Sequence, residues 1–148
     1  MTVNQLKRKL TSLLGQDNVL ASREDLLCYA YDATKRVHVP EIVVFPGSVQ
    51  EVSGIFRIAS QARVPVVPRG AGSGMTGGAL ALQGGIVLAM NRFDQILEID
   101  EDNLVAVVQP AVITGRLQRV VQEMGLFYPP DPASLEFSTL GGNIAENS

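Results

Sequence analysis

The amino-acid sequence predicts a domain of the α+β or mixed α/β class, and three observations support this. Leucines at helical spacing fill residues 3–14, at the start of the chain. A strand, helix and strand pattern follows between residues 42 and 67 and implies a small pair of parallel strands. Apolar runs at residues 95–99 and 104–108 flank Asp100-Glu101-Asp102-Asn103, which is typical of a hairpin turn. The length of 148 residues corresponds to one domain.

The first 38 residues are predicted to form an N-terminal helical segment. Its first helix ends at Gly15 and carries apolar residues on one face, namely Leu6, Leu10, Leu13 and Leu14. A second, short helix begins after Ser22, because Asp25 stands three residues beyond this capping serine. Charges of both signs crowd the segment, which is typical of solvated helix faces, and we assign no site to it.

The remaining residues, 39–148, alternate between predicted strands and helices. Short apolar runs predict three buried strands, at residues 42–45, 64–67 and 86–90. Ser48, with Glu51 three residues later, caps a helix between the first two of these strands. A last helix is predicted from Thr114 to Met124, with Gly125 as its stop.

Composition excludes several classes of function. The chain has 12 basic and 15 acidic residues, whereas a nucleic-acid-binding surface needs clustered Lys and Arg. No apolar run approaches the roughly 18–20 residues that span a bilayer, and the N-terminus lacks a signal-peptide segment. The single cysteine, Cys28, cannot form an internal disulfide, which favours a reducing compartment. We expect a cytoplasmic protein, with peripheral attachment to the inner membrane in a complex as the alternative.

Seven of the 14 glycines lie between Gly70 and Gly85. So many residues without a Cβ cost folding entropy and need a compensating reason. Consecutive N–H groups in turn conformations form a concave nest that binds phosphate oxygens, and the hydroxyls of Ser73 and Thr76 add donors. The alternative is a surface loop made of tight turns, and the glycines alone do not separate the two interpretations.

Two known phosphate motifs fit this loop poorly. Gly72-Ser73-Gly74-Met75-Thr76-Gly77 has the spacing of the dinucleotide-binding fingerprint, and Glu98 and Asp100 stand about 20 residues later. That fingerprint leads into a crossover helix, however, and only residues 78–83 separate the loop from Gly84-Gly85. A P-loop is excluded because no Lys-Ser or Lys-Thr follows the glycines. Phosphate binding here therefore requires another fold.

A second polar and glycine-rich element lies near the end of the sequence. It comprises Tyr128-Pro129-Pro130-Asp131-Pro132-Ala133-Ser134 and then Ser138-Thr139-Leu140-Gly141-Gly142-Asn143-Ile144-Ala145-Glu146-Asn147-Ser148. Its prolines stiffen the chain, and its paired glycines let the backbone come close to a ligand. Together, the two glycine-rich elements suit the two ends of one large ligand.

The stretches PRGAGSGMTGGAL and PPDPASLEFSTLGGNIAENS resemble the FAD-binding domain of the vanillyl-alcohol oxidase type, also called the PCMH type. Within this family, the sequence is most similar to the flavin subunit of bacterial glycolate oxidase and to D-lactate dehydrogenases. The resemblance runs from about Tyr31 to Ser148 and includes PEIVVFPGSVQEV, which is similar to the family's first strand and helix. It implies a small βαβ lobe and a second, mixed or antiparallel lobe around an extended FAD.

The resemblance also implies a set of FAD-binding residues. The first glycine loop would hold the diphosphate through its backbone amides, from Arg69, Gly70, Ala71, Gly72, Ser73, Gly74, Thr76, Gly77 and Gly78. Pro110 and Ala111 would border the adenine end. A channel for the diphosphate, the ribityl chain and the flavin would be lined by Asp131, Pro132, Ser134, Ser138, Thr139, Gly142, Asn143, Ala145 and Asn147.

By the same resemblance, we expect FAD to be bound without a covalent link. Some relatives attach the flavin through a histidine of the first loop, and Ser73 stands at that position here. The single histidine, His38, lies far upstream, before the first predicted strand of the FAD domain.

Similar enzymes oxidise a 2-hydroxy acid, such as glycolate or D-lactate, to the 2-oxo acid. Their substrate-facing residues come largely from a second, C-terminal domain, so we name no catalytic residue and no metal site in this chain. The family also implies partner subunits that carry flavin or iron–sulfur centres. Two alternatives stay open: the same FAD domain serving another alcohol, and a non-catalytic module that does not retain flavin.

The resemblance further implies that the sequence is an N-terminal fragment whose FAD domain is incomplete. Strands that pair with later segments in the family would then leave open edges and uncovered apolar faces. We therefore expect weakened FAD affinity, self-association or partial disorder, chiefly at residues 69–85 and 138–148.

Overall fold

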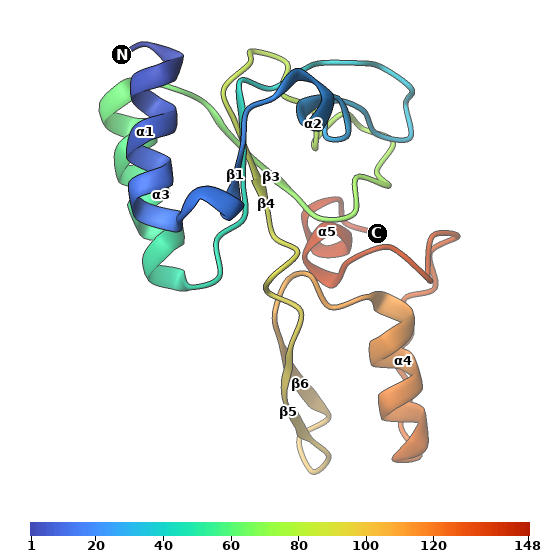
Figure 1. Ribbon diagram of the computed structural model, residues 1–148. Coiled ribbons are helices and arrows are strands. Elements are labelled where there is room, and N and C mark those ends of the chain that lie inside the picture. Colours follow the sequence, from blue (N-terminus) through green and yellow to red (C-terminus); the bar gives the residue numbers. More distant parts are fainter.

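The structure is a computed structural model that describes residues 1–148. It has two lobes, one above the other in Figure 1, and the chain passes from the first to the second after residue 90. The first lobe holds a mixed sheet with helices, and the second holds an antiparallel hairpin and a helix. The predicted α+β architecture is confirmed.

The first lobe is built on a four-stranded sheet, in the order β1 (Val19–Leu20), β2 (Ile42–Val44), β4 (Ile86–Ala89) and β3 (Val66–Arg69). Strand β1, which the sequence did not predict, is antiparallel to β2, and the other pairs are parallel. The expected direct pairing of β2 with β3 is wrong, because β4 lies between them and pairs with both. Every residue of β4 is buried, so this strand takes the centre of the sheet, where both faces are covered.

Helices cover both faces of this sheet. Helices α1 (Val3–Leu14) and α3 (Val49–Ala62) lie on one face, and the short α2 (Arg23–Leu27) lies on the other (Figure 1). The core under α1 and α3 consists of Leu6, Leu10, Leu14, Val19, Ile42, Val44, Ile55, Ala59, Ile86 and Leu88. The N-terminal segment thus shares its core with the sheet, and the domain boundary expected at residue 38 stays a prediction.

The predicted helix caps are present. The Ser22 hydroxyl accepts a hydrogen bond from the Asp25 N–H at 3.2 Å, and the Ser48 hydroxyl accepts one from the Glu51 N–H at 3.2 Å. A short 3-10 helix, η1 (Gln16–Asn18), joins α1 to β1 and was not predicted.

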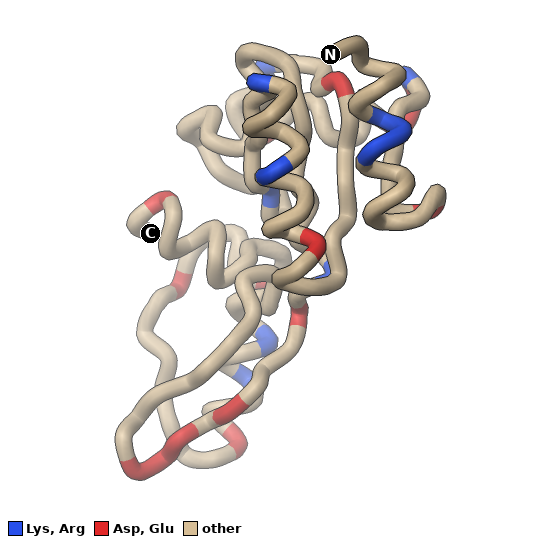
Figure 2. The backbone as a smooth tube through the Cα atoms, turned by 90° about the vertical axis from the view of Figure 1, so that its left-hand side faces the viewer, with Lys and Arg blue, Asp and Glu red and all other residues tan.

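The second lobe consists of the hairpin of β5 (Ile96–Asp100) and β6 (Val105–Val108) with helix α4 (Thr114–Glu123). Its core comprises Val112, Leu117, Val121 and Leu140. Acidic residues cluster at the hairpin tip, whereas basic residues gather on the first lobe (Figure 2). A last helix, α5 (Leu140–Ala145), lies at the junction of the lobes (Figure 1).

The second lobe also exposes apolar side chains. Phe127 is 82% exposed and Ile144 is 77% exposed, beside a groove of about 510 Å³ between the hairpin, α4 and α5. These residues form an exposed apolar surface on the second lobe. None of the helices is long and apolar enough to cross a membrane.

Candidate functional site

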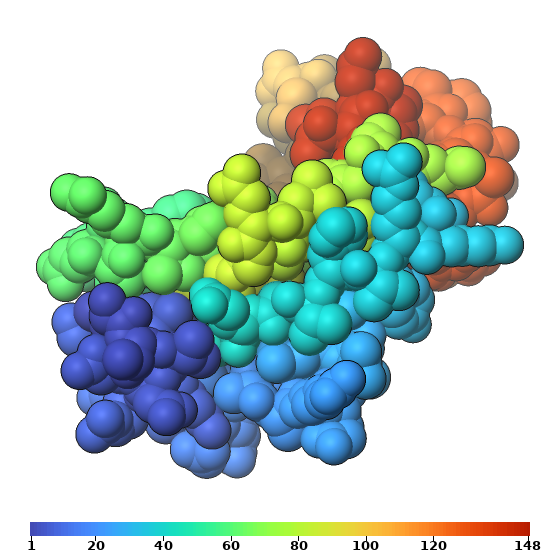
Figure 3. Space-filling model, turned by 90° about the horizontal axis from the view of Figure 1, so that it is seen from above, coloured from blue at the N-terminus to red at the C-terminus, as the bar shows by residue number.

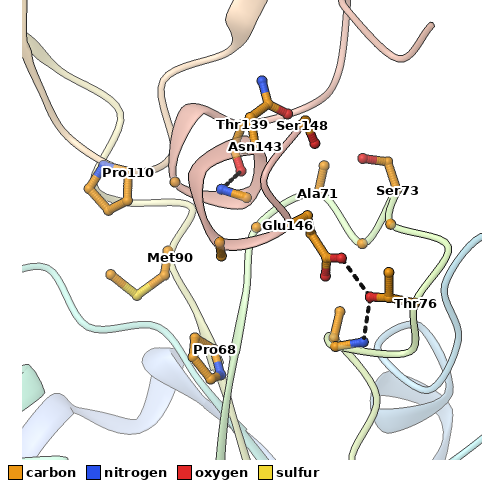
Figure 4. A pocket seen from close by; sticks show the side chains of 18 of the residues that line it. Pro68, Ala71, Ser73, Thr76, Met90, Pro110, Thr139, Asn143, Glu146 and Ser148 are labelled. Carbon is orange, nitrogen blue, oxygen red and sulfur yellow. Dashed lines mark hydrogen bonds between the residues drawn. The ribbon is translucent and has the colours of Figure 1, made fainter. Parts of the chain in front are cut away.

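A cavity of about 800 Å³ opens at the junction of the two lobes (Figure 4). One wall is the glycine loop after β3, and the opposite wall is helix α5 with the segment before it. The two glycine-rich elements predicted to share one ligand thus face the same space. Its volume lies near the upper end of the range for ligand sites, roughly 300–1,000 Å³.

The backbone of the glycine loop is left free to bind a ligand. None of the N–H groups from Gly70 to Thr76 donates a hydrogen bond within the protein. Unpaired N–H donors that line a cavity are costly unless water or a ligand accepts from them. The loop therefore presents the donor-rich concave surface that binds phosphate oxygens.

Two glycines of this loop have no room for a side chain. A Cβ on Gly70 would clash with the Thr139 hydroxyl, where the loop approaches the start of α5. Gly72 adopts φ +70°, in the left-handed region, and a Cβ there would clash with the Arg69 guanidinium. These two positions bring the loop close to α5 and to the side chain behind it.

The opposite wall is held by backbone and side-chain hydrogen bonds at the start of α5. The Thr139 hydroxyl caps the helix by accepting a hydrogen bond from the Gly142 N–H at 3.3 Å. The Gly141 N–H donates to the Pro110 carbonyl at 2.8 Å, which joins α5 to the segment after β6. These bonds therefore fix the start of α5 relative to the segment after β6.

One contact across the cavity was not predicted. The Thr76 hydroxyl donates to the Glu146 carboxylate at 2.6 Å, and the Gly78 N–H donates to the same hydroxyl at 3.3 Å (Figure 4). Glu146 is the one ionisable side chain among the lining residues. It lies within the TLGGNIAEN motif, but its partner is 70 residues away in sequence, so no local signal pointed to the contact.

The cavity also has an apolar end that the sequence did not reveal. Met90, Pro68 and Pro110 lie together in Figure 4, away from Ser73 and Thr76. Phe56 and Leu88 also line the cavity. Of these five residues, only Pro110 was predicted. The cavity can therefore accommodate a ligand with an apolar ring at one end and a phosphate group at the other.

Fourteen of the twenty predicted FAD-binding residues line the cavity. They are Gly70, Ala71, Gly72, Ser73, Gly74, Thr76, Gly78, Pro110, Pro132, Ser134, Thr139, Gly142, Asn143 and Ala145. Six do not line it: Arg69, Gly77, Ala111, Asp131, Ser138 and Asn147.

Three of these six residues have positions that explain why they do not line the cavity. Arg69 is buried behind the loop, where its guanidinium donates to the Ala79 carbonyl at 3.5 Å. Ala111 is buried, and its N–H donates to the Phe93 carbonyl at 2.8 Å. Asp131 is exposed to solvent.

Ser138 belongs to a buried polar network rather than to the cavity surface. Its hydroxyl lies 2.9 Å from the Thr114 hydroxyl, and the Asn143 amide donates to the same Thr114 oxygen at 2.7 Å. Gly77 has φ +85° and does not line the cavity, and Asn147 is exposed beyond α5. The sequence motif did not indicate which of its side chains face the cavity, and the FAD-binding role of these six residues stays a prediction.

The structure excludes the dinucleotide-binding motif as an interpretation of the glycine loop. No helix follows the glycines, since residues 78–83 form turns and lead directly to β4. Gly84 and Gly85 lie outside the cavity, and the Gly85 carbonyl accepts hydrogen bonds from the Glu41 and Ile42 N–H groups. This geometry excludes the dinucleotide-binding fold considered from the sequence.

Comparisons with known proteins identify the family of this chain. The family described as "FAD binding domain" matches residues 40–148. The chain is 47% identical over 149 residues to the glycolate oxidase subunit GlcD of Bacillus subtilis (strain 168), covering 100% of this chain and 32% of that protein. It is 38% identical over 149 residues to the D-2-hydroxyglutarate dehydrogenase of Stutzerimonas stutzeri (strain A1501), with the same two coverages.

A solved structure of alkyldihydroxyacetonephosphate synthase has the same fold, with a TM-score of 0.86 and 23% identity. The match covers 100% of this chain and 32% of the synthase chain. The chain thus spans about a third of the length of the curated relatives it matches. The expected family resemblance and the expected cofactor are confirmed. The chain belongs to the FAD binding domain family, and FAD is its cofactor.

Proposed function

We propose that the cavity holds FAD without a covalent bond, with its diphosphate against the glycine loop. The observation that carries this is the run of unpaired N–H groups from Gly70 to Thr76 on the cavity wall. No Lys or Arg side chain lines the cavity, so backbone dipoles must supply most of the attraction for the anion. Ser73 stands where a covalent histidine would be, which supports a non-covalent complex.

The different chemistry of the two ends of the cavity indicates which part of FAD lies at each end. The adenine ring would lie at the apolar end, against Pro110, Met90 and Pro68. The ribityl chain and the flavin would leave the glycine loop along the segment that contains Pro132 and Ser134. Burial of the adenine ring adds an apolar contribution to binding that the loop amides cannot supply.

We further propose that the protein to which this chain belongs oxidises a 2-hydroxy acid to a 2-oxo acid. This rests on the relatives named glycolate oxidase subunit and D-2-hydroxyglutarate dehydrogenase. FAD supplies the acceptor for the hydrogen that leaves the substrate carbon as a hydride equivalent. The residues of this chain bind and orient the cofactor, and we assign none of them as the base. Partner subunits with flavin or iron–sulfur centres, as electron acceptors, belong to the same proposal.

Two measurements test these proposals separately. Titration of the chain with FAD, followed by flavin fluorescence, should give a saturable complex that ADP competes for. Anaerobic addition of glycolate, D-lactate or D-2-hydroxyglutarate to the full-length protein should bleach its flavin. Binding without bleaching by any of these acids would support the FAD site and contradict the proposed substrate class.

A further inference from the structure

The segment Asp32–Thr34 lies directly behind the glycine loop. In Figure 3 the light blue and cyan stretch of the chain that includes this segment lies beside the light green atoms of the loop. The Ala33 N–H donates to the Gly74 carbonyl at 3.2 Å, so contact is direct. This segment precedes residues 40–148, which carry the family match, and it was assigned no role from the sequence.

Asp32 is an unusual residue at this position. It is only 4% exposed, and its Oδ1 accepts hydrogen bonds from the Thr34 N–H at 2.8 Å and from the Thr34 hydroxyl at 2.5 Å. Burial acts to raise the pKa of Asp32, but the bonds from Thr34, the nearby Gly77 N–H and the charge of Arg69 outweigh it and lower that pKa. Asp32 is therefore ionised inside the protein.

The second oxygen of Asp32 has no hydrogen bond of normal geometry. Its Oδ2 is buried and is left without a partner. A buried carboxylate oxygen without a well-placed donor reduces stability, so a residue that served only the fold would be poorly placed here. Unsatisfied buried groups of this kind cluster at functional sites.

Arg69 provides a positive charge on the same side of the loop. It is 6% exposed, and its guanidinium packs against Gly72 and lies 5.9 Å from the centre of the Tyr29 ring. Burial lowers the pKa of Arg69, while Tyr31, Asp32 and Tyr29 act to raise it. Behind the loop amides, a buried guanidinium adds to the positive potential that a diphosphate would meet.

We propose that Asp32 is a positioning residue for the FAD site: its hydrogen bonds with Thr34 shape the turn in which the Ala33 N–H holds the glycine loop at Gly74. This contact keeps the N–H groups of Gly70 to Thr76 directed into the cavity, and Arg69 supports the same loop at Gly72. This inference rests on the proposed binding of the FAD diphosphate at the loop. It extends the site to a segment outside the matched domain.

The test compares Asp32→Asn with Asp100→Asn in the full 148-residue chain. Asp100 is a matched control, because it too accepts hydrogen bonds from a residue close in sequence, Asn103, at 2.9 and 2.7 Å, and its pKa is likewise lowered. It lies at the hairpin tip, away from the cavity. Each substitution removes one negative charge from an aspartate with local hydrogen bonds.

We expect Asp32→Asn to weaken binding of both FAD and ADP by about ten-fold or more, as when one hydrogen bond to a charged group is lost. At saturating FAD, the ³¹P resonances of the bound diphosphate should shift in Asp32→Asn and stay in place in Asp100→Asn. A purely structural role would lower the unfolding temperature but would leave the ³¹P spectrum of the saturated protein unchanged.

A second variant covers the case in which Asp32→Asn does not fold. Thr34→Val removes the hydroxyl that holds Oδ1 and keeps the Asp32 charge, and it should weaken FAD and ADP in the same direction by a smaller factor. The inference would be overturned if the folded variants, Asp32→Asn or Thr34→Val, had the same FAD and ADP affinities and the same ³¹P spectra as Asp100→Asn. The proposed function would still stand in that case. If the unaltered chain bound neither FAD nor ADP, the proposed function would fail and this inference with it.

Discussion

Replacing Gly74 by alanine should separate FAD binding from stability. Gly74 does not have a positive φ, and the nearest atom to a Cβ there would be the Glu146 Oε1 at 3.5 Å, an ordinary contact. The substitution therefore causes no clash within the protein. Because alanine also restricts the unfolded chain, we expect the free energy of unfolding to stay the same or to rise by up to about 1 kcal/mol.

The same methyl group would lie between the glycine loop and Glu146, in the space assigned to the diphosphate. Extra methyl groups in a packed site cost about 1–3 kcal/mol. At 1.4 kcal/mol for each factor of ten, FAD affinity should fall by roughly 5- to 150-fold. Affinity for ADP should fall by a similar factor, because ADP carries the same diphosphate.

Gly125→Ala is a control that should lower stability and leave FAD affinity unchanged. Gly125 has φ +75° and no neighbour within 4 Å of an added Cβ, so its cost is backbone strain alone, about 1–2 kcal/mol. That corresponds to a decrease of about 2–8 °C in the unfolding temperature with unchanged FAD affinity. Fluorescence titration with FAD and thermal unfolding without ligand measure both quantities. Gly74→Ala binding FAD as tightly as the unaltered chain would refute the reasoning.

Three further predictions follow from the site. Glu146→Gln should tighten FAD binding by about two- to five-fold at low salt, because an exposed carboxylate at the loop repels the diphosphate, and the gain should shrink as salt is added; weaker binding would contradict this. Denaturation of the FAD complex should release all of its flavin, and colour retained on the unfolded chain in a gel would contradict a non-covalent complex. Since the pKa of Asp32 is lowered from 3.8, the stability it contributes is present above that value and is lost as pH falls through the lower folded pKa. Urea unfolding across acid pH should therefore show the unaltered chain and Asp32→Asn converging as pH falls, and a constant difference would count against an ionised Asp32.

Local signals in the sequence predicted most of the helices. Leu6, Leu10 and Leu14 recur at helical spacing, and the serine caps at Ser22 and Ser48 fixed the starts of the next two helices to within a residue. These signals depend on neighbours within a few positions. Helix α5 gave no such signal, because Gly141 and Gly142 are poor helix formers. It is held instead by the Thr139 cap and by its bond to Pro110.

Strand order could not be predicted from the sequence pattern. The two strands of the βαβ unit look like direct neighbours in sequence, and only the burial of β4 on both faces explains why it lies between them. The two-residue strand β1 is too short to have a pattern of its own.

In the candidate site, too, the sequence displays the local features but not the contacts between distant segments. The glycines and the TLGGNIAEN motif located both walls of the cavity, since backbone approach needs residue types that the sequence displays. Arg69 and Ser138 stand in these motifs, but their side chains are buried in the protein and do not line the cavity. Glu146 was missed because its contact with Thr76 joins segments 70 residues apart. The Asp32–Thr34 segment was missed because its contact with the loop is the bond from Ala33 to Gly74, which also joins residues far apart in the sequence.

The most direct test of the account is a crystal structure of this chain with FAD. We predict diphosphate oxygens at hydrogen-bond distance, about 2.7–3.2 Å, from two or more backbone nitrogens between Gly70 and Thr76. A bound FAD whose diphosphate lay elsewhere, with those nitrogens facing only solvent, would contradict the central claim.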